Sequence, residues 1–188
     1  MKPARMKSIF IRIIAVCFLL LFAGGSAGLG ERSTVPFNGE ITFHKISLTI
    51  PDNYVRDSTQ STENVWVFEK GFYSRHIILS RQDAQNDTGR QLDAYAEYLK
   101  EQGMTSERTV FLELEAVRSE GMQGDKMWRE MCFAHDGSIY AVAMIGSSEE
   151  DMQMLLDTVA VHDEAPEITA QPDDRTPLER FLGYFFGN

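Results

Sequence analysis

The feature that most limits the fold is a pair of β-rich runs joined by Asp136-Gly137. Asp-Gly favours the positive φ of a two-residue hairpin turn, so residues 126–134 and 138–145 are predicted to form adjacent antiparallel strands. The run 108–118 alternates an apolar face with a mixed one, which predicts a half-buried strand just before them. Three strands in succession without an intervening helix indicate an antiparallel sheet rather than alternating βαβ units.

An earlier stretch of the chain carries a second block of three predicted strands. Apolar residues alternate over 41–50 with one change of register near Lys45, which predicts a single strand with a bulge or short bend. The turn cluster 51–53 is predicted to end that strand. Residues 64–69 and 72–81 are rich in β-branched and aromatic residues, and a short Gly-containing step between them predicts a tight hairpin.

A helix is predicted after each block of strands. The first covers 89–102, where Thr88 and Gln91 fit a capping box and Gly103 suits the helix end. Each helix has one apolar face at helical spacing: Leu92, Tyr95, Ala96 and Leu99 in the first, and Met152, Leu155, Leu156 and Val159 in the second.

The second helix is predicted to start at Ser147 or Ser148, with Ser147 and Glu150 as its capping box. Acidic residues in its first turn complement the helix dipole. The predicted order is therefore βββ-α-βββ-α, an α+β fold in which helices flank an antiparallel sheet.

The first 27 residues have the three-part order of a cleavable export signal. Four basic residues precede an unbroken apolar run over 13–22, and small residues follow over 23–28. No acidic residue occurs in this segment. The apolar run is about half the roughly 20 residues that a membrane-spanning helix needs. The sequence predicts an exported protein of the periplasm or cell envelope with no stable membrane span after cleavage, and an uncleaved anchor stays open as the alternative.

Removal of the signal changes the charge of the protein. The chain has 18 basic and 28 acidic residues, so loss of the four basic residues of 1–27 leaves 14 against 28, a net charge of −14. Nucleic acids and anionic membranes are bound through Lys and Arg, so an acidic chain is not expected to bind either. Cys17 leaves with the signal, and Cys132 is then predicted to be a lone, buried thiol.

The rest of the chain divides by composition. Residues 28–39 are predicted to be a flexible lead-in, 40–161 the folded domain, and 162–175 an acidic linker with two prolines. Residues 176–188 are predicted to form a short amphipathic helix, with Thr176 as its N-cap and Pro177 at its first position.

The apolar stripe of that C-terminal helix is the predicted partner-binding element: Leu178, Phe181, Leu182 and Phe185. Four large apolar side chains at the end of a polar linker need a surface to cover them. That surface is the chain's own domain, a groove on a protein partner, or a second copy. A membrane interface is the weakest of the alternatives, because the stripe brings only Arg180 as a cation.

Residues that resemble parts of chemical sites are few, and no catalytic residue, metal ligand or cofactor is predicted. Cys132 and His135 have C-x-x-H spacing, whereas a structural zinc site needs four ligands. Glu113 and Glu115 are expected to share one face of a strand, where a solvated pair is more common than an acid–base pair. Six methionines near the last hairpin and helix are predicted to fill the core rather than bind Cu(I): Met122, Met127, Met131, Met144, Met152 and Met154.

Two stretches carry a resemblance to a known family. Residues 46–54 (ISLTIPDNY) and 132–140 (CFAHDGSIY) resemble the opening strand and the last hairpin of the PsbP-like α/β/α sandwich proteins. That group includes the photosystem extrinsic protein, a Ran-binding factor and exported bacterial proteins such as DcrB. The resemblance covers roughly 40–161. It implies an antiparallel sheet flanked by helices and an accessory or binding role, with no shared catalytic residues.

These observations together predict an exported, non-catalytic binding or accessory protein of the periplasm or cell envelope. Two alternatives stay open at this point. One is a periplasmic hydrolase or metal-binding protein whose site assembles from scattered residues. The other is a structural subunit of an envelope complex, docked through the C-terminal helix.

Overall fold

The computed structural model describes residues 36–58, 60–71, 75–84 and 87–164. The elements in these ranges are β1 (Pro36–Phe43), β2 (Ile46–Arg56), β3 (Val65–Lys70), β4 (Arg75–Asp83), α2 (Thr88–Glu101), β5 (Thr105–Phe111), β6 (Leu114–Gln123), β7 (Lys126–His135), β8 (Ser138–Ile145), α3 (Glu149–Leu156) and β9 (Ala160–Val161). The predicted signal peptide 1–27 and C-terminal helix 176–188 lie outside the described residues. In the part of the chain that is described, no helix is long and apolar enough to cross a membrane.

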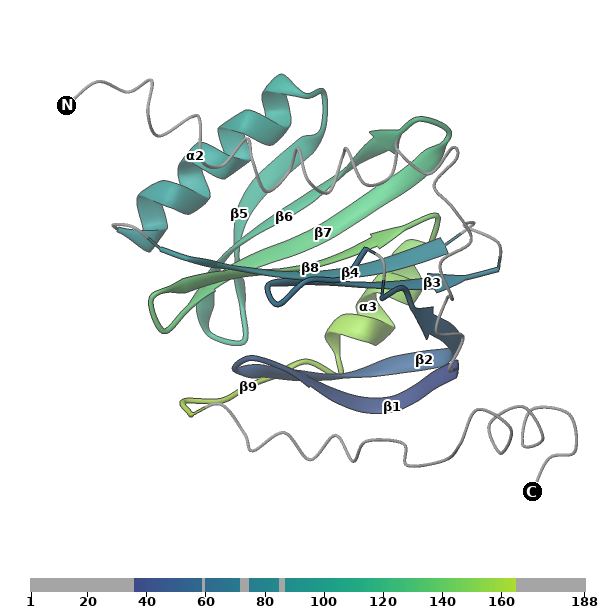
Figure 1. The fold of residues 1–188 in the computed structure, drawn as a ribbon. Helices are drawn as coiled ribbons and strands as arrows, with labels where there is room; N and C mark the ends of the chain where they lie inside the picture. The colour runs from purple at the N-terminus through teal and green to yellow at the C-terminus, as the bar shows by residue number, and fades with distance from the viewer. Residues whose placement is uncertain (1–35, 59, 72–74, 85–86, 165–188) are drawn as a thin grey trace, which may run out of the picture.

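All the strands pair antiparallel, and the class is α+β as predicted. The sheet order is β1-β2-β3-β4-β8-β7-β6-β5, with β9 paired to β2. The hairpin predicted from Asp136-Gly137 joins β7 to β8, and both turn residues have positive φ, 44° and 67°. Figure 1 shows α2 and α3 on opposite sides of this sheet.

Each predicted block of three strands contains four. The predicted strand 41–50 is the β1–β2 hairpin, whose turn contains His44 at φ 55°. The predicted strand 108–118 is the β5–β6 hairpin, which turns at Leu112 and Glu113 with φ of 52° and 63°. The predicted order βββ-α-βββ-α is therefore wrong in detail, because both tight turns use residues other than the Asn or Gly that normally mark them.

Three predicted boundaries also differ. The cluster 51–53 does not end a strand, because β2 runs through it to Arg56. β1 begins at Pro36, inside the segment 28–39 predicted as a lead-in. The cap of α2 is Asp87 rather than Thr88: its carboxylate accepts from the amides of the next turn.

The cap of α3 is Ser148. Its hydroxyl accepts from the amide of Asp151 at 3.0 Å, and the Asp151 carboxylate accepts from the Ser148 amide at 3.0 Å. The capping box is therefore present one residue later than the predicted pair of Ser147 and Glu150. A cap shifts easily by one position when two serines and three acidic residues follow one another, since each can supply the oxygen.

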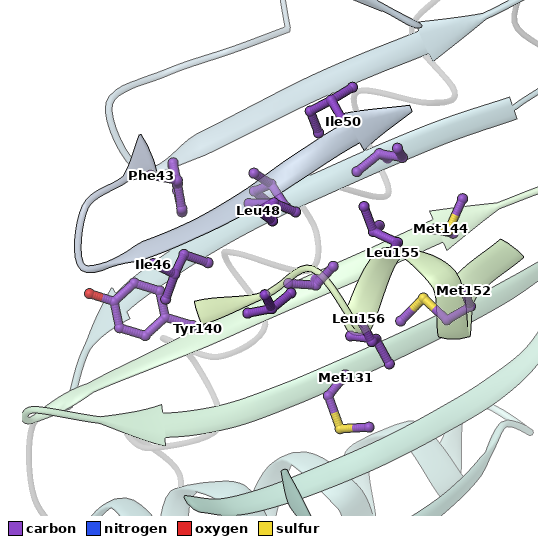
Figure 2. Packing of buried hydrophobic residues seen from close by; sticks show 14 of the residues in the cluster. Phe43, Ile46, Leu48, Ile50, Met131, Tyr140, Met144, Met152, Leu155 and Leu156 are labelled. Atoms are coloured by element: carbon purple, nitrogen blue, oxygen red, sulfur yellow. The ribbon is translucent and has the colours of Figure 1, made fainter. Parts of the chain in front are cut away.

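The sheet is covered on one side by a layer that includes its own first hairpin. β2 pairs with β3 only where Val55 and Arg56 meet Glu69 and Phe68. β1, β2 and β9 therefore leave the plane of the other strands and lie beyond α3 (Figure 1). Figure 2 shows side chains of β2 and α3 meeting those of β7 and β8. The main core fills this space, with Phe43, Ile46, Leu48, Phe133, Tyr140, Val142, Met152 and Leu155 among its buried members.

The packing of α3 gives a matched test of this core. Leu155 is 1% exposed and Met154, beside it, is 56% exposed. We expect Leu155→Ala to lower the free energy of unfolding by about 2–5 kcal/mol, because it leaves a cavity between α3 and the sheet. Met154→Ala should change it by less than about 0.5 kcal/mol. Urea unfolding of both variants measures the difference, and equal midpoints would contradict this placement of α3.

Candidate docking surface on the sheet

The face of the sheet opposite the main core divides into two halves. Helix α2 covers the first half, where Leu92, Tyr95, Ala96 and Leu99 pack against Val117, Cys132, Ile139 and Ala141. These partners lie on β6, β7 and β8 at alternating positions, so their neighbours in sequence point into the main core. α2 therefore covers part of this face of the sheet, as α3 covers part of the opposite face.

The second half carries a separate apolar cluster, called here the apolar patch: Val65, Val67, Ile78, Trp128, Ala143 and Ile145. The register places Val67 opposite Ile78, Ile78 opposite Ala143, and Trp128 opposite Ile145, so the patch crosses β3, β4, β8 and β7. Each of the six residues is at most 7% exposed. Of the described residues, only Met104 is partly buried against the patch from outside it.

The reach of α2 explains where the covered half ends. The helix packs on β5, β6 and β7 and stops at Glu101, and Gly103 at φ 80° turns the chain back into β5. Met104 then lies over Gly121, where a Cβ atom would come within 2.8 Å of the Met104 Cγ. The missing side chain of Gly121 therefore leaves space for Met104. No described helix continues from there over β3 and β4 (Figure 1).

A buried carboxyl lies on the same face, between the two halves. Glu130 points to the α2 side of β7; its Oε2 accepts from the Tyr95 hydroxyl at 2.6 Å and from Ser119 Oγ at 3.3 Å. Burial raises the pKa of Glu130, while the hydrogen bonds from Tyr95 and Ser119 act to lower it. Because the carboxyl is held by α2 and β6 at once, it fixes the helix on the sheet.

The thiol of Cys132 is unreactive in this setting. Burial, and then the neighbouring charge of Glu130, raise its pKa well above the ordinary value of 9.0. A thiol that stays protonated is a weak nucleophile and a poor metal ligand. The prediction that Cys132 is buried is confirmed, and its thiol is free.

An imidazole is buried beside the patch. His76 lies on β4 opposite Ile145 of β8 and Glu69 of β3, and it is 3% exposed. Neither ring nitrogen has a hydrogen-bond partner. The pKa of His76 is lowered to about 4, mainly by burial; repulsion from Lys126 adds to the lowering, and attraction to Asp57 opposes it. The face thus offers apolar contact and a neutral imidazole.

The structure separates the residues of the C-x-x-H pair. Cys132 and His135 are three positions apart on β7, so their side chains point to opposite faces of the sheet. His135 instead donates from Nε2 to the carbonyl of His162, 2.9 Å away. Among the described residues there is no group of three or more His, Cys, Asp or Glu side chains placed to hold a metal ion.

The glutamate pair is also separated, and the prediction that Glu113 and Glu115 share a strand face is wrong. Glu113 lies in the β5–β6 turn, whereas Glu115 is on β6 and pairs with Arg108 at 3.4 Å. The methionines divide between two environments. Met131, Met144 and Met152 belong to the main core as predicted, but Met122 and Met154 are 60% and 56% exposed, which contradicts core filling for those two.

One scattered set of polar residues does converge, near β9. His162 Nε2 and Ser47 Oγ lie 2.9 Å apart, and the Lys45 ammonium binds the Asp136 carboxylate close by. A Ser–His contact is the first requirement of a serine nucleophile. However, Ser47 is only 4% exposed, so a substrate would not reach it. The Ser47–His162 contact ties the chain just after β9 to β2, and the Lys45–Asp136 ion pair ties the β1–β2 turn to the β7–β8 turn.

The sequence analysis did not predict the apolar patch, Glu130 or His76 as parts of one surface. The alternation of Trp128, Glu130 and Cys132 on one face of β7 was the available signal, since a carboxyl in an otherwise apolar row needs a partner. The four predicted partner-binding residues, Leu178, Phe181, Leu182 and Phe185, lie outside the described residues.

Comparison with known proteins finds likeness in structure only. No family model and no curated protein matches the sequence. A crystal structure from Bacteroides thetaiotaomicron VPI-5482 matches with a TM-score of 0.48 and 12% identity, over 68% of this chain and 50% of that one. This chain thus spans about half the length of the Bacteroides protein.

The solution structure of cyanobacterial PsbP (CyanoP) from Synechocystis sp. PCC 6803 matches with a TM-score of 0.42 and 12% identity. The match covers 74% of this chain and 98% of that chain. PsbP is the family that residues 46–54 and 132–140 resemble. The likeness is one of fold alone and says nothing of what this chain binds, and the narrower likeness to DcrB stays a prediction.

The lowered pKa of His76 predicts a specific loss of stability in acid. Between pH 6.5 and about 4 an unfolded chain binds a proton on this ring and the folded chain does not. The free energy of unfolding therefore falls as the pH is lowered through that window. We expect His76→Leu to flatten this part of the pH profile, measured by urea unfolding at steps from pH 7 to 4. Parallel profiles for the two proteins would show that His76 is not held neutral.

Proposed function

We propose that this chain is an exported, non-catalytic binding or accessory protein of the periplasm or cell envelope, and that it binds through the apolar patch. The observation that carries the proposal is the patch itself: six buried apolar side chains on four strands, beside a helix that does not reach them. Sheet faces of this kind are normally closed by a helix or by another chain.

The chemistry of the face fits an apolar protein segment as the ligand. The six residues of the patch are all uncharged, and its small residue Ala143 lies centrally, opposite Ile78 on β4 and Glu130 on β7. An amphipathic helix laid across the strands would bury its apolar face here in the manner of helix-in-groove recognition. The acidic net charge of the chain favours a partner with basic residues flanking its apolar ones.

Export is supported by the sequence of residues 1–27. A signal peptide would be removed in crossing the membrane and would release the acidic chain that begins near residue 28. The stripe of Leu178, Phe181, Leu182 and Phe185 is the second docking element of the chain, for a protein partner or for the chain's own domain.

Capture from an envelope extract tests the patch as the binding surface. The exported chain is used as bait beside Val67→Asp, which places a charge in the patch, and Met154→Asp, which places the same charge on α3 away from it. We expect a captured protein to be lost at least tenfold with Val67→Asp and retained with Met154→Asp. Circular dichroism confirms that both variants are folded. Equal capture by the two variants would contradict the proposal.

A further inference from the structure

The methionines of the described residues differ widely in exposure, although they lie close together in the sequence. Met122 on β6 and Met154 on α3 are 60% and 56% exposed, and Met104 and Met127 are half-buried. The others are at most 6% exposed and belong to the main core, and all of them are labelled in Figure 2: Met131, Met144 and Met152. Two thioethers thus project into water, where they contribute nothing to the core.

We infer that Met122 and Met154 are reversible oxidation sites, which take up oxygen from a peroxide as methionine sulfoxide while the core methionines are spared. The inference is independent of the proposed function, because it involves neither the apolar patch nor a partner. Peroxides oxidise thioethers, and reductases specific for methionine sulfoxide return them to the reduced form. Both steps need a sulfur atom that a reagent can approach from water.

The reaction uses one peroxide molecule at each site. The methionine Sδ attacks one peroxide oxygen, so that an S–O bond forms and the O–O bond breaks. The sulfur loses two electrons to the peroxide, and the leaving hydroxide takes the proton of the transferred oxygen and departs as water. In the reverse reaction two thiols supply the electrons and form a disulfide, and the oxygen leaves as water.

The surroundings of Met122 tolerate the polar product. Strand periodicity places Met122 on the same face of β6 as Arg118 and Glu120. Arg118 pairs with Glu149 at 2.8 Å, and Glu120 pairs with Arg129 at 3.7 Å. A sulfoxide oxygen at Met122 would therefore lie in water, in line with charged side chains, and no polar group would be buried by its formation.

Helix α3 separates an exposed thioether from a buried one. Met152 and Met154 are two positions apart, which is about 200° around a helix, so they lie on opposite sides of α3. On the solvent side Gln153 donates to Asp157 Oδ1 at 2.7 Å. On the core side an oxygen on Met152 would be placed among apolar side chains, which is unfavourable.

The thiol of Cys132 does not compete for the oxidant. Peroxides react with a thiolate that is open to water. Cys132 is 3% exposed, and burial raises its pKa, so the group stays protonated and out of reach. The first oxygen that the folded chain takes up is therefore expected on a methionine.

Hydrogen peroxide followed by peptide mass spectrometry tests the inference on the chain without residues 1–27. We expect Met154 to be oxidised at least roughly tenfold faster than Met152, its buried neighbour on the same helix. Met122 should react at a rate similar to that of Met154, and Met104 and Met127 should be intermediate. In urea the methionines should react at one rate, because their protection comes from the fold.

Two variants assign the fast uptake to these sites. Met122→Leu/Met154→Leu should lose it, whereas Met144→Leu, a matched change in the core that conserves volume, should keep it. After the fast uptake the circular dichroism of the unmutated chain should be unchanged. Methionine sulfoxide reductase with a dithiol should then restore the original mass.

Equal rates at Met152 and Met154 in the folded chain would overturn the inference. Fast uptake that persists in Met122→Leu/Met154→Leu would do the same, because other residues would then be the sites. Loss of the circular dichroism signal during the fast uptake would show that the sulfoxides are not tolerated in the fold, and a mass that the reductase cannot restore would show that the sites are not reversible.

Discussion

Strand β8 imposes the constraint on which the rest of the structure depends, because all eight of its residues are buried. A strand buried along its whole length needs apolar cover on both faces of the sheet. On one face α3 and the β1–β2 hairpin supply it, and the β2–β3 pairing is short enough to let that hairpin lie beyond α3. On the other face α2 supplies it for Ile139 and Ala141 but not for Ala143 and Ile145. The candidate site is the part of this second face, around Ala143 and Ile145, that lies beyond the cluster formed by α2.

The polar groups of that face fit the same account. Glu130 marks the limit of α2, since Tyr95 of the helix binds its carboxylate. His76 lies beyond that limit, where burial keeps its ring neutral. A neutral imidazole and a protonated thiol carry no charge, so both are compatible with an apolar ligand. The groups beside the patch are therefore consistent with the apolar ligand that the proposed function gives it.

Much of the fold followed from local patterns, and the errors have a common cause. The Asp136-Gly137 turn was predicted because its residues favour positive φ, but His44, Leu112 and Glu113 adopt positive φ without any such preference. Those turns are held by the strands that they join, whose pairing is not visible in a short window of sequence. The patch could not be predicted either, since it is defined by how far α2 reaches across β7. The apolar stripe at the C-terminus was visible in the sequence, but it lies outside the described residues.

The central claim is that the apolar patch is a binding surface. Methyl NMR measures this most directly, on Val65, Val67, Ile78 and Ile145 of the chain without residues 1–27, during titration with a protein captured from the envelope extract. We predict that chemical-shift changes concentrate on these patch methyls, with Leu48 and Ile50 of the main core unaffected. Shift changes that spare the patch methyls while the partner binds would contradict the account.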